Sequence, residues 1–416
     1  MANTFQFVDW IGQEAIRRLT NRLAIADGFN TSYNKEYKKE FAVGDTIRIP
    51  YPVRGLVRDG LTYAPQPVNV RQTTVTVDQP FGMDFEYDSI DQALKMGKGE
   101  AWITDTIINP YMDQLAQEFD SRASNYAYLH SNNIVGSLKT TPTDTSLAGQ
   151  ARQRMMENAC PPGEYKMVMT PASMRSIVDG TLTQFNPNDV ISKAFKEGYY
   201  GRARNFTWFE SMSLYQHTPG NWQTPASVTV SGSGQSGTSL LLNCTSGDTF
   251  LEGDVFNIAA VNNVNPVTRR STGTLRQFRV TQSITASAST VTVQISGGDG
   301  QGIAGPGDQY QNVDALPLTT AVLTLFPGTA TPSTSGTGWQ GLAFSREGFA
   351  MVGVNMMMPK AVEMSVQKRD PKTGIAISLI RAFDPIQRKM VNRFDTLIGF
   401  GELYSNACSV RCLSAT

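Results

Sequence analysis

The sequence predicts an α+β protein in which a small antiparallel β-barrel domain is inserted between two α+β segments. Three observations indicate this class. Two stretches place apolar residues at helical spacing, others alternate apolar and polar residues in period two, and the composition changes sharply in mid-chain. At 416 residues, the chain also exceeds the size at which one hydrophobic core usually splits into domains.

An N-terminal helical arm is expected over residues 1–35. Within FVDWIGQEAIRRLTNRLAI the apolar residues fall four apart and form one stripe, made of Ile11, Ala15, Leu19 and Leu23. Asp27-Gly28 ends the helix. Its basic face, Arg17, Arg18 and Arg22, could touch nucleic acid, but an ordinary solvated face is the favoured interpretation.

Residues 36–90 read as an extended loop, a β-hairpin. GDTIRIPYPV and QTTVTVD alternate in period two and are punctuated by prolines, and such a two-stranded segment rarely builds a core alone. We therefore expect it to lie on a neighbour. Its basic residues are Arg48, Arg54, Arg58 and Arg71.

Three carboxylates, Asp84, Glu86 and Asp88, share one face of the same predicted strand. They could bind a cation, pair with basic residues of another subunit, or form an ordinary solvated face. The basic residues of the hairpin favour pairing between subunits over a metal site.

Residues 91–223 predict a long helix and an α+β core. The helix, over 101–130, carries an apolar stripe that should pack on a sheet, with Pro110 in its first turn or at a kink. Strands are expected at EYKMVMT and NFTWFESMSLY, and helices at PASMRSIVDG and NPNDVISKAFKEG.

The inserted domain is expected over residues 224–341. No lysine occurs between Lys196 and Lys360, and residues 224–341 hold six or more short strands separated by Gly, Pro and Asn, which is typical of a barrel or sandwich. Residues 342–416 return to the α+β core. There RKMVNRFDTLIGFGELY reads as a link into the last strand. Met356, Met357 and Met358 could form a promiscuous binding surface, but a buried strand is favoured.

The composition speaks against several classes of function. Lys+Arg and Asp+Glu are both 36, whereas gripping nucleic acid requires concentrated positive charge. His130 and His217 are the only histidines, and neither has a carboxylate or cysteine at ligand spacing. The match of residues 300–305 to GxGxxG is followed by Pro306-Gly307, which cannot open a phosphate-binding helix. We expect no catalytic residue, cofactor, metal or membrane span, and four reduced cysteines.

Three stretches resemble the major capsid (coat) proteins of tailed bacteriophages, specifically the short-tailed-phage coat protein family with an inserted β-barrel domain. The first is WITDTIINPYMDQLAQEFDSR, with matches at Pro110, Leu115, Ala116 and Asp120. In the second, AFKEGYYGRARNFTWFESMSLYQHTPG, the matches are Gly198, Gly201, Arg202, Phe206, Ser211, His217 and Thr218. The third runs over the closing strands and matches at Asp370, Gly374, Arg393 and Asp395. Their order and spacing together carry the likeness.

The resemblance implies a Hong Kong 97-type capsid fold with N-arm, extended loop, peripheral domain with spine helix, and axial domain. It further implies self-assembly into hexamers and pentamers of an icosahedral shell. A scaffolding protein, a portal, and encapsidated double-stranded DNA bound without sequence specificity are the implied partners. The location implied is the virion capsid, assembled in the host cytoplasm. The helical stripe and the hairpin charges are then candidates for subunit interfaces.

Some relatives join subunits by an isopeptide bond from a hairpin lysine to an asparagine. This chain departs from them, because residues 44–84 contain no lysine. Two other functions remain open from the sequence: a carbohydrate-binding or adhesin-type structural protein of a phage fibre or bacterial surface, suggested by the Ser/Thr/Gly-rich barrel, and an enzyme without a familiar motif.

Overall fold

The computed structural model describes residues 4–33, 46–55, 57–58, 60–63, 65, 68–88, 108–137, 140–182, 201–222, 228–326, 338–358, 364–370, 373–386 and 389–413. These residues belong to two compact units. The first consists of Met1–Arg48, Thr74–Ala123 and Ala350–Gly401. The second consists of Ile49–Thr73, Ser124–Phe349 and Glu402–Thr416.

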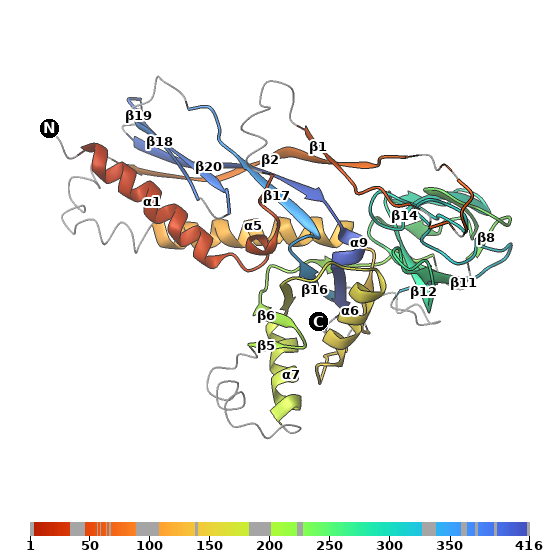
Figure 1. Ribbon diagram of the computed structural model, residues 1–416. Coiled ribbons are helices and arrows are strands. Elements are labelled where there is room, and N and C mark those ends of the chain that lie inside the picture. The colour runs from red at the N-terminus through yellow and green to blue at the C-terminus, as the bar shows by residue number, and fades with distance from the viewer. Residues whose placement is uncertain are drawn as a thin grey trace. The chain divides into compact units, whose positions relative to one another are not determined.

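The first unit is built mainly on one antiparallel sheet with helices along one face (Figure 1). The strand order is β1-β2-β20-β19-β18, and β17 also pairs with β20. The strands are β1 (Thr46–Pro50), β2 (Gln72–Asp88), β17 (Phe349–Val354), β18 (Met364–Arg369), β19 (Ala376–Asp384) and β20 (Lys389–Glu402). The helices are α1 (Thr4–Arg22), the short 3-10 turn η1 (Ala26–Gly28) and the first part of α5 (Asn109–His130).

The expected N-terminal helix is confirmed as α1. It packs on β18 and β19 of the same chain, and the Ala15 and Leu19 side chains are fully buried there. A Cβ added at Gly12 would come within 3.1 Å of the Lys368 side chain, so the helix lies close to the sheet at this point. The described side chains of the stripe, Ala15, Leu19 and Leu23, therefore belong to the core of the first unit.

The expected long helix is confirmed as α5, which begins at Asn109 and so has Pro110 in its first turn. Its apolar stripe packs on the sheet, as predicted. The Phe119 ring meets Phe81 edge-on at 4.7 Å between centroids, and Tyr111 lies 5.4 Å from Phe85. Residues 101–107 lie outside the described part of the chain.

Two expectations about the strands of this sheet are wrong. The stretch 388–404, read as a link, contains the 14-residue strand β20, and β2 pairs with it from Val75↔Gly401 to Asp88↔Lys389. Most of β2 is therefore a core strand, and only its start pairs with β1 as a hairpin would. Period-two alternation identifies a strand without naming its neighbour, which explains both errors.

The second unit contains a mixed sheet of seven strands, in the order β3-β21-β16-β4-β6-β5 with β7 paired to β16. These strands are β3 (Ile134–Val135), β4 (Tyr165–Met169), β5 (Arg202–Ala203), β6 (Phe206–Glu210), β7 (Gln216–His217), β16 (Gly338–Ser345) and β21 (Ser409–Leu413). The helices are α6 (Ser146–Glu157), α7 (Pro171–Leu182) and α9 (Ser405–Cys408). The helix expected at residues 186–198 lies outside the described residues.

The rest of the second unit is the inserted barrel. Its main sheet has the order β15-β11-β12-β14-β9-β8, and β10 pairs with β13 beside it. These strands are β8 (Thr229–Val230), β9 (Ser239–Asn243), β10 (Thr249–Phe250), β11 (Val255–Val264), β12 (Ser271–Val280), β13 (Ile284–Thr285), β14 (Thr290–Ser296) and β15 (Leu323–Leu325).

Backbone hydrogen bonds close this sheet into a barrel. Val230 donates to the carbonyl of Ala321 at 2.9 Å, and Leu323 donates to that of Val228 at 2.9 Å, so the chain around β8 at one edge meets the start of β15 at the other. The domain has its own apolar core, which includes the fully buried Trp222 stacked on Phe250 at 5.2 Å.

The inserted barrel was expected to begin at residue 224 and end at residue 341, but its core includes an earlier residue and the mixed sheet resumes before 341. Trp222 precedes the first limit and yet fills the barrel core. At the other end, β16 starts at Gly338 and pairs with β4 and β21 of the mixed sheet. Where an independently folding domain begins and ends stays a prediction.

The glycine-rich stretch 300–305 is a loop of the barrel, and Gly302 and Gly305 are closely packed there. A Cβ at Gly302 would lie 1.8 Å from the carbonyl oxygen of Gly237, so no larger residue fits there.

The prediction of a buried strand at Met356, Met357 and Met358 is wrong. Strand β17 ends at Val354, and the Met357 side chain is 96% exposed.

Candidate functional site

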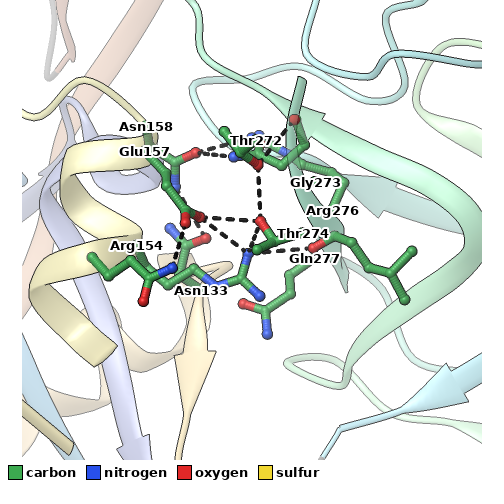
Figure 2. A network of polar contacts seen from close by, with 12 residues as sticks. Asn133, Arg154, Glu157, Asn158, Thr272, Gly273, Thr274, Arg276 and Gln277 are labelled. Atoms are coloured by element: carbon green, nitrogen blue, oxygen red, sulfur yellow. Dashed lines mark hydrogen bonds and ion pairs between the residues drawn. The ribbon is translucent and has the colours of Figure 1, made fainter. Parts of the chain in front are cut away.

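A buried polar network joins the barrel to the mixed sheet (Figure 2). Arg276 of β12 is its centre. Its guanidinium donates to the side-chain oxygens of Asn263 at 2.5 Å and Asn158 at 3.4 Å, and to the carbonyl of Gly297. Burial lowers the pKa of Arg276 to about 10, so it stays cationic at neutral pH. We call this group, with its neighbours described next, the junction network.

The amide of Asn158, directly after α6, continues the network into the mixed sheet. It donates to Asn133 at 3.2 Å and to the Asn406 carbonyl at 3.1 Å. The Asn133 amide also reaches that carbonyl, at 2.6 Å. Three segments far apart in sequence thus meet through buried amides, which satisfy one another where water is excluded.

A second row of contacts runs alongside, and Figure 2 shows it between α6 and β12. Arg154 donates to Thr274 at 3.1 Å, and Thr274 donates to the Glu157 carboxylate at 3.1 Å. Gln277 exchanges two hydrogen bonds with the backbone of Ile134, at 2.8 and 2.9 Å. Because so many directional contacts must break together, the barrel is held in one orientation on the mixed sheet.

Asp254 holds the residues through which the chain enters the barrel domain. This fully buried carboxylate accepts hydrogen bonds from the Trp222 indole at 3.2 Å and the Leu251 N–H at 3.0 Å, and lies 2.9 Å from Nε2 of His217. No carboxylate stands at ligand spacing from His217 in the sequence, because Asp254 is 37 residues away and only the fold brings the two together.

The extended segment, residues 51–71, is attached to the barrel at its base. The Arg71 guanidinium lies over the Tyr310 ring, 4.0 Å from its centroid, and also faces Tyr51 at 5.4 Å. It donates to the Asp299 carbonyl at 2.7 Å, while the Tyr310 hydroxyl donates to the carbonyl of Asn69 at 2.5 Å. We call the contacts of Arg71 with Tyr51, Tyr310 and Asp299 the arginine clamp.

The Asp299 carboxyl lies buried beside this clamp. Burial, followed by the nearby Glu402 carboxylate, raises the pKa of Asp299 to about 6. Arg54, Arg71 and Arg276 act in the opposite direction. The carboxyl therefore titrates close to neutral pH at the point where the segment, the barrel and the mixed sheet meet.

Beyond its base, the extended segment presents apolar side chains to solvent. Leu61 is 99% exposed, Val57 97% and Tyr63 82%. The apolar side chains of this segment that are exposed are Val53, Val57, Leu61, Tyr63, Val68 and Val70. A cluster of this kind on one short segment is typical of a surface that another molecule covers.

The helical stripe was expected to contact a neighbouring subunit. The structure buries Ala15, Leu19 and Leu23 within the first unit, so these side chains have almost no exposed area left for such a contact. The side chain of Ile11 lies outside the described part of the chain. An interface role for the arm stays a prediction, and it would have to use another face of α1.

The basic residues of the predicted hairpin are placed separately. Arg48 is exposed on β1, and Arg58 donates to the carbonyls of Gly60 and Thr62 within its own loop, at 2.8 and 2.5 Å. The carbonyl of Arg54 accepts from Gln309 of the barrel at 2.7 Å. Their contact with another subunit stays a prediction.

The carboxylates of β2 face basic residues of the same chain. Asp84 lies 3.8 Å from Arg393, and Glu86 lies 2.5 Å from Lys389, both on the adjacent strand β20. The side chain of Asp88 lies outside the described residues. Pairing with another subunit stays a prediction, although Asp84 and Glu86 already have partners.

Sequence reasoning missed Arg71, Asp254 and Arg276 as positioning residues. The sequence contains a partial signal for Arg276: it stands two and four residues before the apolar Phe278 and Val280 and so shares their face of β12.

In the described ranges, no three His, Cys, Asp or Glu side chains gather as a metal site requires. None of the described helices is long and apolar enough to cross a membrane.

The chain is similar to several solved structures. A structure of Mycobacterium phage Che8 is 12% identical and matches over 94% of this chain and 90% of its own, with a TM-score of 0.48. The capsid of Ralstonia phage GP4 is 7% identical, matches over 90% of this chain and 84% of its own, and has a TM-score of 0.42. The CUS-3 coat protein I-domain is 29% identical, matches over 24% of this chain and 95% of its own, and has a TM-score of 0.19.

No family model and no curated protein matches the chain. The fold is described by its own elements. Helical arm, extended segment, long helix, mixed sheet, inserted barrel and closing strands follow one another as the resemblance implied. The described residues therefore form an α+β fold with an inserted antiparallel β-barrel, and the order of their elements is the one that the resemblance to Hong Kong 97-type capsid proteins implied.

Proposed function

We propose that this chain is a major capsid protein, which self-assembles into the icosahedral shell that encloses the double-stranded DNA genome of a phage. The exposed apolar side chains of the extended segment carry the proposal. A segment that is fixed at its base and exposes several apolar side chains is suited to pack on a second copy of the chain. In this role the chain catalyses no reaction.

The charge of the chain supports association with itself. Charged residues make up 17% of the chain, against about 25% in typical soluble domains. Equal numbers of basic and acidic residues leave no net charge, so copies do not repel one another strongly. A surface used identically by every copy also generates closed symmetric assemblies such as rings of five or six subunits.

The resemblance supplies the remaining parts of the proposal. Hexamers and pentamers form around a scaffolding protein, a portal occupies one vertex, and the shell holds DNA without reading its sequence. The protein is located in the virion capsid and is assembled in the host cytoplasm. The absence of net positive charge agrees with contact to DNA that is loose and unspecific.

Negative-stain electron microscopy of the full chain, expressed with and without a scaffolding partner, tests this function. We expect rings or shells. Replacing Val57 by Ser should impair their formation while thermal unfolding of the subunit stays unchanged. The matched control is Val267→Ser, which alters an exposed valine on the barrel and should assemble normally. Fibres, or subunits that never associate, would refute the proposal.

A further inference from the structure

Two cysteines from distant parts of the second unit lie side by side. The sulfur atoms of Cys160 and Cys408 are 3.0 Å apart, although the residues are 248 positions apart in sequence. Cys160 follows the turn after α6, where Ala159 takes a positive φ of 59°, and Cys408 ends α9. The backbone turn at Ala159 directs the chain so that Cys160 faces the short helix.

The surroundings favour a reaction between these two sulfurs over any other. Both side chains are buried in the apolar core of the mixed sheet, with Cys408 fully so. Bonded sulfurs in a disulfide are about 2 Å apart, so closure requires a movement of roughly 1 Å. The hydrogen bond with Cys408 lowers the pKa of Cys160, which makes Cys160 the sulfur that is more readily ionised.

We propose that Cys160 and Cys408 form a disulfide when the protein meets a peroxide. The peroxide oxidises the Cys160 thiolate to a sulfenic acid. The Cys408 sulfur then attacks the sulfenic sulfur, the S–S bond forms and the oxygen leaves as water. Two thiols and one hydrogen peroxide give one disulfide and two waters, so the step is balanced.

The bond would close a covalent ring that contains the whole inserted barrel. Such a ring restricts the unfolded chain and thereby favours the folded one. In the reducing cytosol the pair stays open, and it closes only in an oxidising environment such as the exterior of the cell. This inference does not depend on the proposed function.

The test uses the full chain, purified with reductant, transferred to buffer without it and treated with a small excess of hydrogen peroxide. Denaturation in an alkylating reagent then counts the free thiols by mass. We expect alkylation of Cys244 and Cys412 only, a non-reduced peptide that joins Cys160 to Cys408, and a higher urea midpoint of unfolding than for the reduced chain.

Cys244→Ser and Cys412→Ser are the matched controls and should leave the link intact, whereas Cys160→Ser should abolish it. If that last variant does not fold, the peptide map of the unaltered chain still decides. Four free thiols, sulfinic acid at Cys160 without a link, or a peptide joining another pair of cysteines would each overturn the proposal.

Discussion

The guanidinium of Arg71 lies 4.0 Å above the ring of Tyr310, which connects the base of the extended segment to the inserted barrel. The Arg71 side chain also donates to the Asp299 carbonyl at 2.7 Å. A planar guanidinium can stack and donate at the same time, whereas an ammonium group cannot cover the ring in this way. The barrel therefore holds the segment in place within one chain.

Replacing Arg71 by Ala should release the base of the extended segment. Cation–π contacts are worth about 1–2 kcal/mol when partly buried, so local opening should become easier while global unfolding changes little. Hydrogen exchange of residues 68–71 measures this, and we expect faster exchange there. Arg71→Lys should give an intermediate rate. An unchanged exchange rate in the Ala variant would show that the arginine clamp does not stabilise the base of the extended segment.

Replacing Arg276 by Met should destabilise the subunit by about 3 kcal/mol. The change removes a buried cation and leaves the oxygens of Asn263 and Gly297 without their donor, while the Asn158 oxygen keeps the Asn263 amide at 3.0 Å. Urea unfolding measures the loss. Arg270→Met, at an exposed position nearby, is the control and should change stability by less than about 0.5 kcal/mol. Equal effects of both substitutions would contradict a special role for the junction network.

Replacing Asp299 by Asn should stabilise the subunit at pH 7.5 but not at pH 4. The pKa of Asp299 is raised to about 6 in the folded chain, above roughly 3.9 when unfolded. A raised carboxyl pKa contributes stability that is fully present below the unfolded pKa and lost as pH rises through 6. Ionisation at neutral pH thus disfavours the folded state, on the order of 3 kcal/mol at most.

Unfolding free energies of the wild type and of Asp299→Asn at several pH values check this sign. Taking the difference between the two chains cancels the contribution of other groups that titrate in both. The gain in the variant should grow between pH 4 and pH 7. A difference that is the same at every pH would show that the carboxyl does not titrate there.

Replacing Asp120 by Ala should weaken the attachment of the N-terminal arm. Its buried carboxylate accepts the backbone N–H groups of Ala24, Ile25 and Ala26 at 2.8, 3.1 and 3.0 Å. Leaving these donors unsatisfied costs about 2–3 kcal/mol. Asp113→Ala, which removes the part-exposed ion pairs with Arg18 and Arg22, is the control and should cost under about 1 kcal/mol.

Equilibrium unfolding monitored by circular dichroism compares these two variants. The contacts of the arm with the sheet also predict the result of deleting residues 1–30. The truncated subunit should lose stability as well as the ability to form correct shells, because it exposes the sheet surface that α1 covers. A fully stable truncated subunit would contradict this placement of the arm.

Mature particles heated in SDS should release monomers of 45.5 kDa, the mass of the chain. Residues 44–84 contain no lysine, so the isopeptide bond of some relatives cannot form from this segment. Electrophoresis under reducing conditions provides the measurement. A ladder of covalent oligomers would contradict the expectation.

The sequence predicted the elements better than their partners. Helical spacing located α1 and α5, and the strand signals located the barrel between the α+β segments, because each depends on residues close together in the chain. β20 was read as a link, since alternation along a strand does not reveal which strands lie beside it. Arg71 and Asp299 are 228 residues apart, so no local pattern could connect them.

The apolar extended segment, fixed by the barrel and covered by a second copy of the chain, is the main element of the proposed assembly. Cryo-electron microscopy of particles formed by the full chain tests it most directly. We expect shells of five- and six-membered rings in which residues 51–71 of each subunit lie on a neighbouring copy. Filaments, or shells in which Val57 and Leu61 remain exposed to solvent, would contradict it.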